Sequence, residues 1–284
     1  MNLLASAPGQ GLCFLNAMID EIDRNDAVTR ERRASARVLV IGLGALGCPA
    51  ALHLAAAGIG RLILLDPDRV ELSNLHRQIL HRTSSIGMLK VESAAAWLRT
   101  RFPSVHCEPH AEALTPENLG GYLGEADFAI DATDGVGAKF LINDGAVRVR
   151  RPFSHAGIIG FLGQTMTVLP GRSACYRCLF PEPPAQGEIP SCQEAGVMAG
   201  VSGIVGALQA AEAIACVSGQ SVRLAGRVLT VDALSGRWRK IEVPRLRRCP
   251  VCAETRSDCQ AEGAAAMDSR LAAPARARYG ESKV

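Results

Sequence analysis

Apolar and polar positions alternate along the first half of the chain in the way that α/β proteins require. Residues 37–41 and 61–66 are short apolar runs typical of buried parallel strands, and residues 45–58 between them are apolar at helical spacing. The pattern then repeats, which predicts helices at 88–98 and 138–149 and strands at 105–111 and 127–132. Such alternation predicts a Rossmann-like, doubly wound, mainly parallel sheet.

The pattern changes after Arg151. Residues 153–169 are strand-forming and punctuated by glycine, and residues 227–233 and 237–243 form a hairpin pattern around a Leu-Ser-Gly turn. We therefore expect antiparallel strands that extend the parallel half, with Trp238 packed among them. Between these strands the sequence predicts a proline-rich loop and a small-residue helix, at 181–190 and 195–217.

The chain divides into three segments. Residues 1–36, which include a charged run at 20–33, are predicted to be a helical lead-in, and residues 37–252 to be one folded unit. That unit has two halves that meet near residue 150. Residues 253–284 are mainly Ala, Arg, Ser and Glu without periodicity, so we expect a disordered tail.

Composition narrows the class of protein. Of the 284 residues, 48% are hydrophobic and 21% are charged, as in an ordinary globular protein. A net charge of +3 and an aromatic content of 4% argue against direct nucleic-acid binding. The most apolar stretch, 197–208, is shorter than the roughly 20 residues that span a bilayer, so we expect no membrane segment. The N-terminus has no secretory signal pattern, which predicts a cytoplasmic protein with its ten cysteines in a reducing compartment.

A glycine-rich motif joins the first predicted strand to the first predicted helix. Gly42, Gly44 and Gly47 belong to it, and Ala45 stands inside it. In this context glycines let a phosphate or ribose approach the backbone closely, beside free N–H groups at the helix N-terminus. Asp66 ends the second strand, where a carboxylate can accept hydrogen bonds from ribose hydroxyls. The motif predicts nucleotide binding, and a tight turn without a ligand is the alternative.

Two cations near this motif favour ATP over NAD. Arg77 belongs to the loop after the second strand, together with Asn74 and His76, and Lys90 begins the next predicted helix. Guanidinium and ammonium groups neutralise phosphate oxygens, which a triphosphate needs more than a dinucleotide does. Asp134 follows the fourth strand, at the edge of the sheet where α/β ligands bind, and could hold Mg²⁺.

Two CxxC pairs predict a structural metal site. Each pair offers two thiolates from one turn, and two such turns supply the Cys₄ set of a closed tetrahedral zinc site. The four residues are Cys175, Cys178, Cys249 and Cys252. Buried or redox-active thiol pairs are the alternative. Because a closed shell leaves no position for a substrate, we expect the zinc to have no catalytic role.

The sequence resembles the MoeB/ThiF/HesA family of ubiquitin-activating-enzyme-like sulfur-carrier protein adenylyltransferases. The resemblance extends from residue 37 to residue 252 and includes the two CxxC pairs. The other motifs that carry it are those at 42–47, 73–78, 86–93, 131–134 and 191–198.

The resemblance implies a reaction and its site. A small ubiquitin-like sulfur carrier attacks the α-phosphate of ATP·Mg²⁺ with the carboxylate of its C-terminal Gly-Gly, which gives an acyl-adenylate and pyrophosphate. By this likeness Asp66 holds the ribose, Asp134 positions magnesium and Lys90 contacts the triphosphate. The loop residues implied to contact ATP are Gly42, Gly44, Ala45, Gly47, Ser73, Asn74, Leu75, His76 and Arg77. Residues 151–252 would bind the carrier and the zinc, and two chains would form a homodimer.

The chain departs from the family pattern at three places. Ala45 replaces a glycine of the nucleotide loop, and Gly135 replaces the asparagine that usually follows the second aspartate. An Arg-Tyr-x-Arg-Gln segment, from which a partner subunit's arginine normally reaches the phosphates, is absent. Met18 stands where that arginine aligns, and Arg24 or Arg30 could substitute for it.

Cys192 is a separate candidate. It lies on the proline-rich loop just before the small-residue helix, whose positive end would activate a thiol. In the family the equivalent cysteine is a thioester or sulfur-transfer site in some members and is dispensable in others. We therefore group Cys192 with Arg77, Lys90 and Asp134 as catalytic candidates. The sequence ends shortly after Cys252, so we expect a separate protein to donate the sulfur.

Three other functions compete with this interpretation. A dehydrogenase is disfavoured by Arg77 and Lys90, and NAD-dependent reduction of a substrate would revive it. A related tRNA-modifying dehydratase shares the adenylation half, but the weak net charge argues against RNA. A catalytically silent or scaffold member fits the missing arginine segment, and failure to bind ATP would support it.

Overall fold

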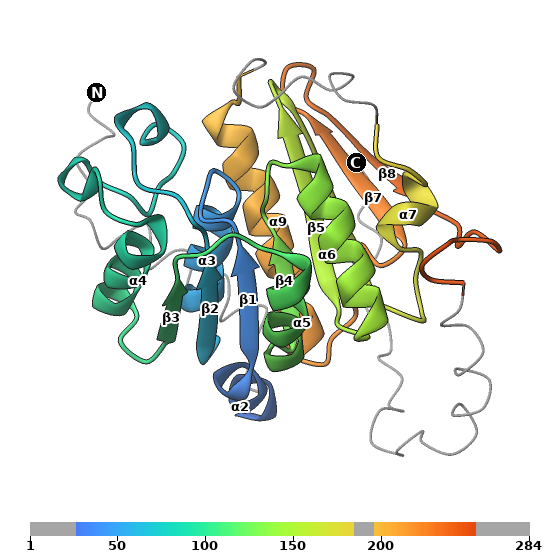
Figure 1. Cartoon of the computed structure of the whole chain (residues 1–284), viewed down its shortest axis with the longest axis horizontal. Helices are drawn as coiled ribbons and strands as arrows, with labels where there is room; N and C mark the ends of the chain where they lie inside the picture. The colour runs from blue at the N-terminus through green and yellow to red at the C-terminus, as the bar shows by residue number, and fades with distance from the viewer. Residues whose placement is uncertain (1–26, 185–195, 254–284) are drawn as a thin grey trace, which may run out of the picture.

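The computed structural model describes residues 27–184 and 196–253, which form an eight-stranded sheet with helices on both faces (Figure 1). The strands lie in the order β3-β2-β1-β4-β5-β6-β7-β8. Their bounds are β1 Arg37–Ile41, β2 Arg61–Leu65, β3 His106–His110, β4 Phe128–Asp131, β5 Phe153–Ile159, β6 Leu162–Val168, β7 Arg227–Asp232 and β8 Arg237–Glu242. The helices are α2 Ala27–Ser35, α3 Gly47–Ala56, α4 Lys90–Arg101, α5 Pro116–Glu125, α6 Val136–Arg148, α7 Tyr176–Leu179 and α9 Ala199–Val217.

Strands β3, β2, β1, β4 and β5 are parallel, as the alternating pattern predicted. Both faces of this half are covered: α3, α4 and α9 pack on one face, and α5 and α6 on the other (Figure 1). A strand covered on both faces must be apolar at successive positions. In β1, Val38 and Val40 enter one core layer, and Leu39 and Ile41 enter the other.

Helix α5 is an element that the hydrophobic pattern did not predict. Its ten residues include three glycines, which weaken any periodic signal. The helix is stabilised by its N-terminal cap and by its packing. Thr115 and Asn118 form a capping box, and Leu119 and Leu123 are buried against the second core layer.

Strands β6, β7 and β8 extend the sheet antiparallel to one another, and β6 is antiparallel to β5. The predicted antiparallel extension is therefore confirmed. Strand β8 is the edge strand, and all six of its residues are exposed. Trp238 is 52% exposed, so the prediction that it packs in the core is wrong. The reason is that β8 pairs only with β7 and belongs to neither core layer.

Helix α9 crosses the sheet and packs against α3, β4, β5 and β6. By length and composition alone, it is long and apolar enough to cross a membrane. Its inner face nevertheless buries two polar residues with partners in the fold. Gln209 donates to the Asp131 carbonyl at 2.8 Å, and Glu212 accepts from Thr167 Oγ1 at 2.9 Å. In this structure α9 is a core helix.

Candidate active site

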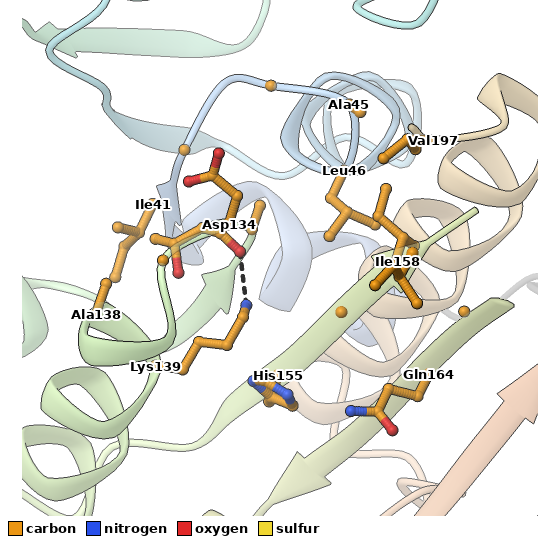
Figure 2. Close-up of a pocket in the computed structure, with 18 of the residues that line it drawn as sticks. Ile41, Ala45, Leu46, Asp134, Ala138, Lys139, His155, Ile158, Gln164 and Val197 are labelled. Carbon is orange, nitrogen blue, oxygen red and sulfur yellow. Dashed lines mark hydrogen bonds between the residues drawn. The ribbon is translucent and has the colours of Figure 1, made fainter. Parts of the chain in front are cut away.

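A cavity of about 1020 Å³ lies at the carboxyl ends of β1, β2 and β4 and continues along β5, β6 and β7. Ligands of open α/β sheets bind at this edge, where the strand order reverses between β1 and β4. Figure 2 shows Lys139, His155 and Gln164 along the sheet-lined end, with Asp134 closer to the glycine loop. The cavity is therefore lined both by the predicted nucleotide motif and by the second half of the chain.

The glycine loop leaves no room for side chains at two of its positions. Gly42 has a φ of +94°, and a Cβ there would lie 2.7 Å from the carbonyl oxygen of Ala132. A Cβ at Gly47 would collide with the Gly42 carbonyl oxygen. Gly44 and Ala45 line the cavity. Ala45 has no positive φ, so its replacement of the family's glycine needs no backbone strain.

Asp66 holds the glycine loop in place. Its Oδ2 accepts a hydrogen bond of 2.6 Å from the Leu43 N–H, and its Oδ1 accepts one of 2.8 Å from the Asp68 N–H. The side chain lines the cavity, and the residue is 5% exposed. A carboxylate has about four acceptor positions, so Asp66 can also accept ribose hydroxyls.

Both predicted phosphate-binding cations reach the cavity. Lys90 is the first residue of α4 and is 6% exposed, and its Nζ lies 2.7 Å from Asp68 Oδ2. Arg77 donates to Asn74 Oδ1 at 2.8 Å and to the Ser73 carbonyl at 3.2 Å. Because Asp68 is far more exposed than Lys90, it can turn away when a phosphate approaches.

Asp134 is exposed and lines the cavity from the turn between β4 and α6. An exposed carboxylate at this position can take a hydrated Mg²⁺ without breaking a buried contact. Other predicted contact residues do not line the cavity: Gly47, Ser73, Asn74, Leu75 and His76. Ser73 and Asn74 instead orient Arg77.

A buried group of three ionisable side chains adjoins the cavity, and sequence analysis did not predict it. Lys139 Nζ donates to the carbonyl oxygens of Thr133 at 2.6 Å and Ala156 at 2.7 Å, and it lies 3.6 Å from Asp131 Oδ1. His155 Nδ1 lies 2.8 Å from Asp131 Oδ2. All three residues are buried, and the most accessible of them, Lys139, is only 7% exposed.

The charges of this group follow from its surroundings. Burial raises the pKa of the Asp131 carboxyl, but Lys139 and the hydrogen bond from His155 outweigh burial and lower the pKa to about 2. Burial lowers the pKa of His155, and the charge of Lys139 lowers it further. A neutral His155 therefore donates its Nδ1–H to an ionised Asp131, which is itself paired with Lys139.

The sheet-lined end of the cavity is formed by residues that sequence analysis did not single out. Gly157, Gln164 and Thr230 follow one another across β5, β6 and β7, with Arg239 next on β8. Tyr176 of α7 completes this wall, and its ring centroid lies 4.2 Å from that of His155. The sequence predicted that these segments are strands, but it did not predict their register across the sheet.

The four CxxC cysteines converge, as their spacing predicted. Their Sγ atoms all lie within 4.8 Å of one another, and all four residues are buried. The Sγ separations are 4.0 Å between Cys175 and Cys178, 3.6 Å between Cys175 and Cys249, and 3.4 Å between Cys178 and Cys252. Sulfur atoms bonded to one tetrahedral zinc at about 2.3 Å lie about 3.8 Å apart, whereas a disulfide measures about 2.05 Å. The cluster can therefore hold a metal ion.

The cysteine cluster is tied to the cavity through α6. Asn143 of α6 accepts a hydrogen bond of 2.8 Å from the Tyr176 N–H, next to Cys175. Arg177 forms an ion pair with Asp144 of the same helix at 2.7 Å. Helix α6 also carries Lys139, so the same helix supports both the cysteine cluster and the buried charged group.

Comparison with known protein families decides the family. The model of the ThiF family matches residues 16–251, which is most of the chain. The chain belongs to the ThiF family. The predicted resemblance to MoeB/ThiF proteins is therefore confirmed.

Curated relatives of this ThiF-family chain are adenylyltransferases. The adenylyltransferase and sulfurtransferase MOCS3 of Anopheles gambiae is 42% identical over 221 residues, which cover 77% of this chain and 50% of that protein. The sulfur carrier protein adenylyltransferase of Thermus thermophilus is 42% identical over 230 residues, which cover 79% of this chain and 85% of that protein. The chain thus spans about half the length of the MOCS3 relatives.

Solved structures support the fold of this ThiF-family chain. The microcin C7 biosynthetic enzyme MccB in complex with N-formylated MccA matches with a TM-score of 0.75 and 22% identity, over 86% of this chain and 75% of that one. Escherichia coli MccB with ATP matches with a TM-score of 0.71 and 23% identity, over 79% of this chain and 69% of that one. At this identity the likeness concerns the fold.

Several predicted residues of this ThiF-family chain lie outside the described residues: Met18, Arg24 and Cys192, and all of the predicted tail at 253–284 except residue 253. Arg30, the other suggested substitute for the missing arginine, is exposed on α2. Helix α2 directly precedes the amino end of β1, whereas the cavity lies at the carboxyl ends of the strands (Figure 1). Arg30 is therefore at the opposite edge of the sheet from the cavity of its own chain.

Proposed function

We propose that this protein activates the C-terminal carboxylate of a small ubiquitin-like sulfur carrier by adenylation with ATP. One observation carries the proposal. A single cavity joins the glycine loop, Asp66 and the cations Arg77 and Lys90 to a wall of strands from the second half of the chain. A nucleotide and the end of a polypeptide can therefore meet in one cavity. The curated relatives, which are adenylyltransferases, support the same chemistry.

The residues at the nucleotide end have distinct roles in this proposal. Asp66 accepts the ribose hydroxyls, and Gly44 with Ala45 lets the phosphates approach the loop. Arg77 and Lys90 neutralise phosphate oxygens, and Lys90 exchanges its contact with Asp68 for one with a phosphate. Asp134 would hold Mg²⁺, which would neutralise charge on the phosphates.

The reaction is a displacement at the α-phosphorus. An oxygen of the carrier's terminal carboxylate forms a new P–O bond, the bond between the α- and β-phosphates breaks, and pyrophosphate leaves with the electron pair. The products are the acyl-adenylate and pyrophosphate. This step needs no covalent nucleophile from the protein, so the work of the site is alignment and charge neutralisation.

The Gly-Gly end of the carrier suits the shape of the sheet-lined end. A tail without side chains can pass Gly157 and Tyr176 and reach the α-phosphorus beside Asp134. Gln164 and Thr230 offer polar groups to its peptide bonds. The buried Asp131, Lys139 and His155 group lies under this path and supports the turn that carries Asp134.

The cysteine cluster is proposed to bind one structural zinc ion. Four buried thiolates at tetrahedral spacing form a closed shell, which is typical of a structural rather than a catalytic zinc. Its contribution would be to hold α7 and the end of the described chain against α6, and so to hold Tyr176 in the cavity wall.

The proposed assembly is a homodimer, and the proposed second step is sulfur transfer. Arg30 lies at the opposite edge of the sheet from its own cavity, so Arg30 could act only in the cavity of a second chain. Conversion of the adenylate to a thiocarboxylate needs a sulfur donor, for which we propose a separate protein. Cys192 is the proposed relay between the donor and the carrier.

The proposal is tested by ATP–pyrophosphate exchange with candidate Gly-Gly carriers. We expect exchange that depends on the carrier and stops when its two terminal glycines are removed. Asp134→Ala and Arg77→Ala should each reduce exchange by about 10²–10³-fold with little change in melting temperature, because both side chains face the cavity. A matched control is Arg69→Ala, since Arg69 donates to the Gly87 carbonyl and does not line the cavity.

Three results would contradict the proposal. Normal exchange in both Asp134→Ala and Arg77→Ala would remove the assigned roles. ATP binding without exchange for any Gly-Gly carrier would favour a catalytically silent scaffold. Reduction of a substrate with NADH in place of ATP chemistry would favour a dehydrogenase.

A further inference from the structure

His81 lies beneath the glycine loop and links three parts of the nucleotide site. Its Nε2 is 3.1 Å from the carbonyl oxygen of Leu43, inside the loop. Its Nδ1 is 3.0 Å from Ser93 Oγ on α4, and its backbone N–H donates to the Gln78 carbonyl at 3.0 Å. The residue is 6% exposed and does not line the cavity. The proposed reaction does not use His81 directly.

The partners fix the form of the ring. The Leu43 carbonyl oxygen can only accept, so Nε2 carries the proton and donates to it. Cys48 Sγ lies 3.7 Å from the same nitrogen and donates its own proton to the Leu43 carbonyl oxygen at 3.2 Å. Nδ1 is then an acceptor, and the Ser93 hydroxyl donates to it. Burial lowers the pKa of His81, and the charge of Lys90 lowers it further, which favours this neutral form.

Leu43 is held from both sides by these contacts. Its N–H donates to Asp66 Oδ2 at 2.6 Å, while its carbonyl accepts from His81 and from Cys48 Sγ at 3.2 Å. The flanking residues are Gly42 and Gly44, which have no Cβ to restrict the backbone. The Leu43 side chain is fully buried, and the hydrogen bonds add to this packing in setting the orientation of the Leu43 peptide groups, and with it the loop surface that faces the cavity.

Ser93 extends the link to the phosphate-binding cation. It lies one helical turn after Lys90 on α4, and it is 4% exposed. Through Ser93, His81 and Leu43, the helix that positions the Lys90 ammonium is connected to the loop that approaches the phosphates. Ser93, His81 and Leu43 are all buried.

We propose that His81 is a positioning residue for ATP: it sets the glycine loop in register with Asp66 and with the Lys90 end of α4. This inference rests on the proposed function, because it presumes that ATP occupies this loop. We expect His81 to affect the affinity of the protein for ATP and not its affinity for the carrier.

The test compares ATP dissociation constants, measured by calorimetric titration with ATP·Mg²⁺, for the wild-type protein and for substitutions of His81. Gln places an amide nitrogen near the Nε2 position, so His81→Gln should stay within about threefold of wild type. His81→Leu removes the donor to Leu43 and should weaken ATP binding about tenfold, which corresponds to about 1.4 kcal/mol. His53→Gln, on the half-buried face of α3, is the matched control and should have no effect.

A second pair of variants keeps the test decisive if His81→Leu does not fold. Asn retains an amide near the Nδ1 position and loses the donor to Leu43, so His81→Asn should bind ATP about tenfold more weakly than His81→Gln. Equal affinity of the Asn and Gln variants would overturn the proposal. A His81→Leu protein that folds and binds ATP within twofold of wild type would overturn it as well.

Two further readouts separate positioning from general destabilisation. The Michaelis constant for ATP in the exchange reaction should rise in His81→Leu, and the Michaelis constant for the carrier should not. Equal increases in both constants, together with a lower melting temperature, would indicate a purely structural role and overturn the proposal. Wild-type protein that binds ATP without carrier-dependent exchange contradicts the proposed function alone, whereas failure to bind ATP contradicts both.

Discussion

Lys139 offers a test of the buried charged group that supports the cavity. Its ammonium is held by the carbonyl oxygens of Thr133 and Ala156 and by the Asp131 carboxylate, at 2.6, 2.7 and 3.6 Å. Replacement by Met keeps a stem of similar length in the same packing but removes the charge and all three donors. We expect Lys139→Met to fold but to lose much of its stability.

The size of the loss follows from the groups left behind. A buried polar group that loses its partner costs about 1–3 kcal/mol, and removal of one partner from a buried ion pair costs about 3–5 kcal/mol. His155 and the Thr133 hydroxyl still donate to Asp131, at 2.8 and 2.7 Å, which limits the cost of the remaining carboxylate. Since such contributions do not add fully, we expect a total loss of about 3–5 kcal/mol.

The dependence on pH gives the prediction its direction. In the wild type the pKa of Asp131 is lowered from 3.8 to about 2, so its contribution to stability is present above pH 3.8 and is lost as the pH falls toward 2. Without the ammonium, the largest influence that lowers the pKa of Asp131 is lost, so less of this acid loss remains. The difference in unfolding free energy between wild type and Lys139→Met should therefore narrow as the pH falls from 3.8 toward 2.

Urea unfolding at pH 7 and at lower pH measures both quantities. Lys139→Arg, which keeps the charge, is the matched control and should lose less stability than Lys139→Met. The double variant Lys139→Met/Asp131→Asn should recover part of the loss, because it removes the unpaired carboxylate. A loss below about 1 kcal/mol at pH 7, or a difference that stays constant with pH, would refute the reasoning.

Four further outcomes are expected. Cys249→Ser should lower both the metal content and the melting temperature, because a structural metal contributes its binding energy to folding; unchanged values of both would exclude the metal site. Asp66→Ala should raise the Michaelis constant for ATP, since it loses the proposed ribose contact and the acceptor for the Leu43 N–H, and an unchanged constant would contradict this. Cys192→Ala should leave pyrophosphate exchange nearly intact and stall thiocarboxylate formation, and full thiocarboxylate formation would exclude a relay. Light scattering at micromolar concentration should give the mass of a dimer, and a monomer would contradict the proposed assembly.

The parts of the fold that could be predicted from the sequence are those with a strong local signal. Residues 37–41 and 61–66 are apolar at nearly every position because helices cover both faces of that half of the sheet. The CxxC spacing likewise reports a local turn with two thiols, and two such turns define the cluster. Helix α5 was missed because its stability comes from a capping box and from tertiary burial rather than from periodicity.

The buried charged group could not be assembled from the sequence, since its members come from β4, α6 and β5. Lys139 carried one usable signal: it lies on the predicted helix 138–149 at a position where a buried face was to be expected, and lysine is rarely buried without a partner. His155 had no such signal. Trp238 was misjudged for the opposite reason, because an aromatic residue in a strand pattern does not reveal that the strand is at an edge without a covering helix.

Helix α9 has a consequence for how the molecule unfolds. It packs on α3 and β4 from the nucleotide half and on β5 and β6 from the second half, and Gly206 allows its backbone to approach Leu46 and Pro49 of the first half closely. The two halves therefore share one core layer and cannot melt independently. Heating should therefore produce one cooperative transition. If ATP binds at the glycine loop as proposed, it should also protect the amide hydrogens of β6 from exchange.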